Sequence, residues 1–207
     1  MPGLAATWLL GVGTLALLML SWFWLANVVS AGDAEPLAYL PLLNPLELGL
    51  LFALGAVFAW ARMGLAELGV DGVRSQWLTQ AVAGASLFAL LTAMVMRTAH
   101  HWGGVPYQLE ALLGSMLVQA GLSIVWTLIA LPLMVFGNRR GRRELWLIGA
   151  ALIALVVAKL FFIELGNRGG LERIVSFIGV GVLLLVVGYF APLPARKTDA
   201  QQPQEQA

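Results

Sequence analysis

The chain has 207 residues, of which 60% are hydrophobic and only 11% charged, and its formal net charge is +1. About a quarter of the residues of a soluble globular protein are charged, so this composition excludes a water-facing shell and predicts a membrane protein. Because the net charge is close to zero, the protein has no overall positive potential that would attract nucleic acid. The lack of cysteine excludes disulfides, thiolate metal sites and a cysteine nucleophile.

Six apolar runs approach or exceed the roughly 20 residues that a helix needs to cross a bilayer. They are residues 4–29, 46–61, 77–96, 116–136, 145–165 and 173–190. The runs are continuous rather than alternating, which excludes a transmembrane barrel and predicts helices, because lipid offers the backbone no hydrogen-bond partners. The first run is long and the second short, so we expect tilt or a thinned bilayer there.

These runs predict an all-α polytopic membrane bundle of about six helices, formed by residues 1–194. The first run lacks the basic start of a signal peptide and is longer than its apolar core, so we expect a retained helix. Residues 195–207 are polar and rich in glutamine, which predicts a disordered cytoplasmic tail.

Lysine and arginine in the short loops predict the topology. The loop after the fourth run carries Arg139, Arg140, Arg142 and Arg143, and it should be cytoplasmic. Alternation then puts both termini in the cytoplasm. It puts the 30–44 loop, which has two acidic and no basic residues, outside.

Small residues recur at every fourth position in two of the runs, at 81, 85, 89 and 93 and again at 150, 154 and 158, all of them alanine. This spacing lets helix backbones approach closely. Such a pattern packs the helices of a bundle and does not by itself form a site. It predicts other membrane helices or subunits as partners, in addition to the lipid bilayer.

Polar side chains gather in the half of the membrane that this topology places outside. They are Asn27, Glu47, Arg97, His100, His101, Glu110, Gln119, Ser123, Lys159, Glu164, Arg173 and Ser176. Ionisable residues in spanning segments commonly line a cavity, pair with one another or mark function. One interpretation is a polar vestibule that opens outward. The other is that helix ends snorkel and cap there.

Lys159 lies deepest of these residues, and no side chain three or four positions away on its own helix can pair with it. It either snorkels toward the interface or serves as a functional base. Lys159, Glu110 and His100 are therefore the candidate catalytic residues.

Glu164 and Arg173 are equidistant from the turn between the last two runs, which predicts a structural ion pair across that helical hairpin. The loop 97–108 contains two glycines and a proline, and we expect a structured turn rather than a helix. His100 and His101 are adjacent and lack a third ligand at zinc-like spacing. We therefore predict no metal site, and no sequence motif calls for a cofactor.

The final hairpin carries the most specific pattern. It comprises the basic turn before the fifth run, Lys159-Leu160-Phe161, Glu164-Leu165, and Arg173 to Phe177 with Gly179 and Gly181. This pattern resembles the C-terminal portion of a bacterial family of multi-pass membrane proteins, domain of unknown function 2339. The entry to the second run, 43–46, and the 101–107 loop resemble it as well.

The resemblance implies a bacterial inner membrane and implies no activity. Glu164 stands where the family pattern leads us to expect aspartate. Family members are usually far longer, so the chain resembles their C-terminal end, as a short independent protein or as a fragment.

The leading functional hypothesis is an inner-membrane scaffold or assembly component of the cell envelope, rather than an enzyme. The alternatives are a membrane enzyme that acts on a lipid or glycan intermediate from the periplasmic side, and a small-solute transporter. The residues alone leave the substrate and the oligomeric state open.

Overall fold

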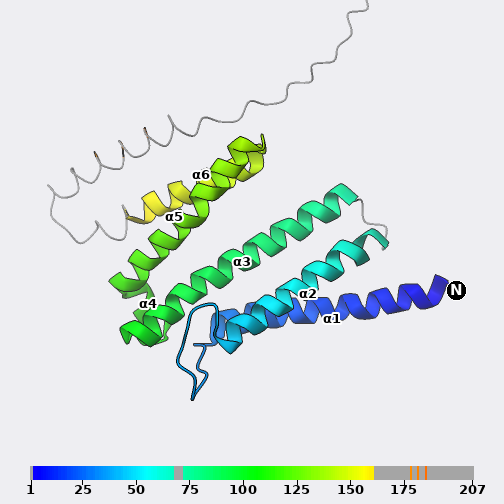
Figure 1. Cartoon of the computed structure of the whole chain (residues 1–207), viewed down its shortest axis with the longest axis horizontal. Coiled ribbons are helices and arrows are strands. Elements are labelled where there is room, and N and C mark those ends of the chain that lie inside the picture. The colour runs from blue at the N-terminus through cyan, green and yellow to red at the C-terminus, as the bar shows by residue number, and fades with distance from the viewer. Residues whose placement is uncertain (1, 68–71, 161–177, 179–180, 182–184, 186–207) are drawn as a thin grey trace, which may run out of the picture. The chain divides into compact units, whose positions relative to one another are not determined.

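The computed structural model describes residues 2–67, 72–160, 178, 181 and 185. Six helices follow one another along the described chain (Figure 1): α1 (Pro2–Val29), α2 (Pro45–Glu67), α3 (Gly72–Gly103), α4 (Leu109–Gly114), α5 (Met116–Arg139) and α6 (Arg143–Lys159). No strand occurs in this part of the chain, which confirms the all-helical prediction for it.

Four helices are long and apolar enough to cross a membrane: Leu10–Val29, Pro45–Leu65, Gly72–Gly103 and Met116–Arg139. They correspond to the first four predicted runs. Helix α6 has 17 residues up to Lys159. The rest of the fifth run, the whole sixth run except three positions, and the predicted tail lie outside the described residues.

Each of the four spanning helices is longer than the apolar run that predicted it, and α2 and α3 exceed their runs the most. Helix α2 has 23 residues and is not short, because the helical backbone continues past Ala61 to Glu67. Helix α3 includes residues 97–103, which we expected in a turn. The helix ends only where Gly104 adopts a φ of +66° and its N–H donates to the carbonyl of His100. Glycine favours this left-handed cap because it has no Cβ.

The chain divides into two compact units, residues 1–122 and 123–207. In the first unit, α1, α2 and α3 pack against one another, around a core of Phe23, Leu50, Leu54 and Leu90. The C-terminal ends of α1 and α3 meet the N-terminal end of α2 beside the 30–44 loop (Figure 1). We call this region the loop end of the first unit.

In the second unit, α5 and α6 form a helical hairpin whose core contains Ala130, Met134 and Ile153. A Cβ added to Gly149 would lie 2.8 Å from the carbonyl oxygen of Ala130. Glycine at this position therefore lets the two backbones approach closely. The predicted alanine face of residues 150, 154 and 158 contributes less than Gly149 to the contact between α5 and α6, since Ala154 is exposed.

Candidate functional site

Arg97 on α3 is fully buried at the loop end, with 0% of its surface exposed. Its Nη2 donates to the backbone oxygen of Asn27 at 2.7 Å and to the side-chain oxygen of Asn27 at 3.2 Å. Its Nε donates to the carbonyl of Ser30 at 3.1 Å. These acceptors belong to the C-terminal turn of α1, where helix carbonyls lack intrahelical partners and the helix dipole favours a cation.

Glu47, in the first turn of α2, supplies the opposite charge and is also fully buried. Its Oε1 lies 3.7 Å from Nη1 of Arg97. The hydroxyl of Tyr39 donates to Oε1, and the backbone N–H of Leu42 donates to Oε2, both at 2.5 Å. One carboxylate therefore joins α2, α3 and the loop between α1 and α2.

Asn44 fixes the start of α2 and the return of the loop. Its Oδ1 accepts a hydrogen bond from the N–H of Leu46 at 2.9 Å, and its Nδ2 donates to the carbonyl of Gly32 at 2.8 Å. The first contact is a side-chain N-cap, and Pro45 follows at the position where proline is favoured. Gly32 has a φ of +81°, and a Cβ there would lie 3.2 Å from Cδ of Arg97. We call Asn27, Tyr39, Asn44, Glu47 and Arg97 the loop-end cluster.

Tyr39 also connects the cluster to the end of α3. Its ring stacks on the ring of His101, with centroids 4.5 Å apart and planes 14° apart. The indole N–H of Trp102 donates to the backbone oxygen of Tyr39 at 3.1 Å. Burial, followed by the hydrogen bond to Glu47, raises the pKa of Tyr39 well above its ordinary value, so the phenol stays protonated.

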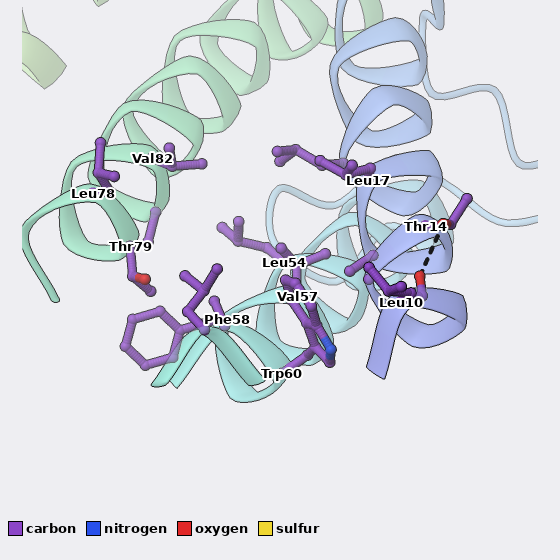
Figure 2. A pocket seen from close by; sticks show the side chains of 16 residues that line it. Leu10, Thr14, Leu17, Leu54, Val57, Phe58, Trp60, Leu78, Thr79 and Val82 are labelled. Carbon is purple, nitrogen blue, oxygen red and sulfur yellow. Dashed lines mark hydrogen bonds between the residues drawn. The ribbon is translucent and has the colours of Figure 1, made fainter. Parts of the chain in front are cut away.

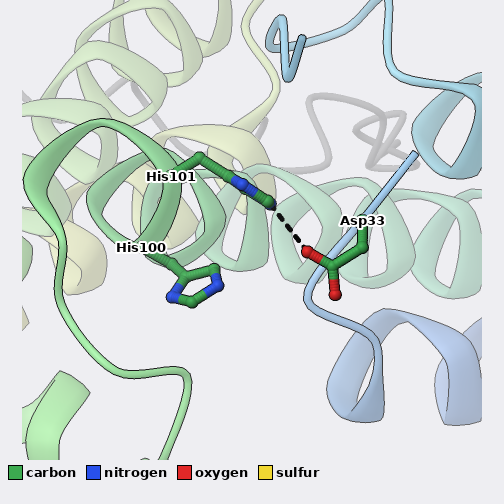
Figure 3. A group of neighbouring side chains, drawn as sticks. All are labelled: Asp33, His100 and His101. Carbon is green, nitrogen blue, oxygen red and sulfur yellow. Dashed lines mark ion pairs between the residues drawn. The ribbon is translucent and has the colours of Figure 1, made fainter. Parts of the chain in front are cut away.

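Asp33, His100 and His101 form a second polar group beside this cluster (Figure 3). Their ligand atoms all lie within 4.8 Å of one another, so the group could hold a metal ion. Nδ1 of His100 lies 2.7 Å from the carbonyl of Val105, and Nε2 of His101 lies 2.9 Å from that of Ala31. The nitrogen of His101 that faces Asp33, Nε2 at 3.8 Å from Oδ1, is therefore already in contact with a backbone carbonyl. Sequence spacing did not reveal Asp33 as a third candidate ligand because it comes from a loop distant in the sequence.

The other predicted site residues lie elsewhere. Glu110 is exposed in the first turn of α4. The side chain of Gln119 donates to the carbonyl of Leu113 at 2.6 Å, where the chain passes from α4 to α5. In the second unit, Nζ of Lys159 donates to Oγ of Ser123 at 2.8 Å.

Lys159 is 9% exposed, and its partner Ser123 lies on the facing helix rather than on its own. The first unit thus brings together Asn27, Glu47, Arg97 and the two histidines. The expected pair Glu164–Arg173, and Ser176, lie outside the described residues.

Sequence reasoning missed Asp33, Tyr39 and Asn44. The Asn44-Pro45 pair is a helix-start signal that could have located the cap. Nothing in the spacing of Tyr39 relative to Glu47 predicts their hydrogen bond.

Residues 3–194 match the model of a protein family described as "Predicted membrane protein (DUF2339)", and the match covers most of the chain. No curated protein and no solved structure matches it.

Proposed function

The chain belongs to the DUF2339 family of predicted membrane proteins, and on that premise we propose that it acts as a scaffold or assembly component of a bacterial inner membrane. The burial of the loop-end cluster carries this proposal. Asn27, Glu47 and Arg97 are at most 2% exposed and are engaged with each other, with Tyr39 and with backbone groups. Polar residues bound in this way hold helices together and leave no surface for a substrate.

The outward faces of the helices support a role in assembly. In each of the four spanning helices only 22% of the most apolar window is buried inside the protein. On α3, Ala81, Gly84 and Ala85 are exposed. Small residues on a lipid-facing surface allow a further helix to approach closely. We place the loop end on the periplasmic side and both termini in the cytoplasm, following the basic loop after α5.

Photo-crosslinking in living cells tests the scaffold proposal. A photoreactive residue at Ala81 or Ala85 should give a discrete adduct heavier than the chain itself. The matched control is Leu128 on α5, which is 62% exposed and has no glycine or alanine three or four positions away. Lipid-only products at both alanine positions would overturn the proposal.

A membrane enzyme is the second candidate, and the Lys159–Ser123 contact favours it. A lysine amine at 2.8 Å from a serine hydroxyl is the arrangement in which lysine serves as base for a serine nucleophile. Replacing Ser123 with alanine and Lys159 with methionine tests this candidate. Normal growth and envelope composition in cells that carry either variant at normal protein level would count against catalysis.

A further inference from the structure

We infer that the half of the three-helix unit away from the loop end binds one anionic phospholipid, with an acyl chain between α1, α2 and α3 and the headgroup beside Arg62. A scaffold requires no such ligand, so this inference goes beyond the proposed function. It depends on two adjoining cavities, on two buried donors and on the charge at the opening.

The first cavity has a volume of about 410 Å³ and lies among the three helices (Figure 2). Leu17 of α1, Leu54, Val57 and Phe58 of α2, and Val82 of α3 line it. Its volume falls within the roughly 300–1,000 Å³ of ordinary ligand pockets. The apolar side chains that line an empty cavity lose dispersion contacts. In a membrane, a hydrocarbon chain of a lipid is the natural occupant of such a cavity.

Small residues explain why the space is there. Gly13 and Ala16 of α1, Ala61 of α2 and Ala83 of α3 contribute to the lining. The large core side chains, Phe23 among them, lie nearer the loop end. The three helices are therefore held together by the loop-end cluster and leave unfilled volume further along.

A second cavity of about 370 Å³ adjoins the first and is more polar than it. Its lining includes Arg62, Ser75, Gln76 and Gln80, and it shares Phe58 and Thr79 with the first cavity. The guanidinium carbon of Arg62 lies 5.8 Å from the centroid of the Phe58 ring. This contact holds a positive charge where the apolar cavity becomes polar, as binding of an anionic headgroup requires.

Two residues that line the first cavity each have a buried donor atom without a partner among the described residues: Oγ1 of Thr79 and Nε1 of Trp60. Thr79 is 9% exposed. Other threonines here donate to the carbonyl four residues earlier, as Thr14 does to Leu10 at 2.9 Å. Buried donors usually find an acceptor. The ester carbonyls of a phospholipid are acceptors located between its chains and its headgroup.

The charge at the opening selects the kind of lipid. Arg62 follows the second run on the side that the topology places in the cytoplasm, where anionic lipids gather. One arginine near a membrane surface favours an anionic lipid by about fivefold. The burial of acyl chains adds little preference, since the surrounding lipid is equally apolar.

Native mass spectrometry of the full chain in detergent tests the inference, with phosphatidylglycerol and phosphatidylcholine added separately. We expect one phosphatidylglycerol to bind about fivefold more tightly than phosphatidylcholine. Arg62→Gln should remove this preference, whereas Arg140→Gln, which replaces an exposed arginine that lines neither cavity, should keep it. Equal binding of the two lipids by the wild type, or a preference retained by Arg62→Gln, would overturn the inference.

Filling the cavity tests the position of the acyl chain. Ala83→Phe should reduce binding of both lipids, while Ala59→Phe, an exposed alanine of α2 outside the lining, should not. If Ala83→Phe does not fold, Thr79→Val removes the donor with little change of shape and should weaken binding of phosphatidylglycerol at least twofold. Wild-type binding by a folded Ala83→Phe, or by Thr79→Val in its place, would refute the site.

Discussion

Replacing Arg97 with methionine should strongly destabilise the protein. The variant loses three hydrogen bonds to the end of α1, two of them buried and one partly buried, and the buried ion pair with Glu47. Glu47 would keep its bonds from Tyr39 and Leu42 but would remain as a buried carboxylate without a counter-ion. Removing one partner of a buried ion pair costs about 3–5 kcal/mol, and we expect a loss of that size.

Unfolding by sodium dodecyl sulfate, followed by tryptophan fluorescence, measures this loss, since the chain has eight tryptophans. Arg140→Met is the matched control and should stay within about 0.5 kcal/mol of the wild type. In a Glu47→Gln background, Arg97→Met should cost at least about 1 kcal/mol less, because no uncompensated charge remains. A loss below about 1 kcal/mol, or the same loss in both backgrounds, would refute the reasoning.

Three further predictions concern other contacts. Asn44→Ala should lower the free energy of unfolding by about 1–2 kcal/mol in the same titration, because it removes the N-cap of α2. Folding raises the pKa of Tyr39, so the contribution of Tyr39 to stability is complete below the ordinary pKa of 10.0 and declines as the pH rises above that value. The wild type should therefore lose stability between pH 10 and 11. Tyr39→Phe should lose less stability over the same range. Gly149→Val should cost about 1–3 kcal/mol by forcing α5 and α6 apart.

Each of these has a contrary outcome. Wild-type stability of Asn44→Ala would show that the cap contributes nothing measurable. Parallel alkaline profiles for Tyr39→Phe and the wild type would assign the pH dependence to other groups. A harmless Gly149→Val, compared with Ala154→Val on the exposed face, would contradict the close approach of the two helices.

Composition and hydropathy were sufficient to predict helices and four of the spans. In lipid, a long apolar run must satisfy its own backbone hydrogen bonds, and a helix does so. Helix ends were harder to predict. A helix continues while its backbone bonds can form, so α2 passes beyond its apolar run and α3 continues through Arg97. The end of α3 depends on which glycine adopts a positive φ, and Gly103 and Gly104 are equivalent in that respect until the fold exists.

The candidate site was predictable only in part. The alternation of spans predicted Asn27, Glu47 and Arg97 in the outer half of the membrane, and the three side chains contact one another in the first unit. It could not show that the 30–44 loop folds over them, because that depends on contacts of Tyr39 and Asn44 with residues distant in the chain. For the same reason, the sequence could not predict that Asp33 lies beside His100 and His101.

The loop-end cluster also imposes an order on the insertion of the protein into the membrane. Arg97 is synthesised about fifty residues after Glu47, which at 5–20 residues per second is about 3 to 10 seconds later. During that interval the carboxylate at the start of α2 has no cation, but its two other donors, Tyr39 and Leu42, have already been made. The nascent chain can therefore shield Glu47 within its own hairpin of α1 and α2, and the arrival of α3 then completes the charge balance.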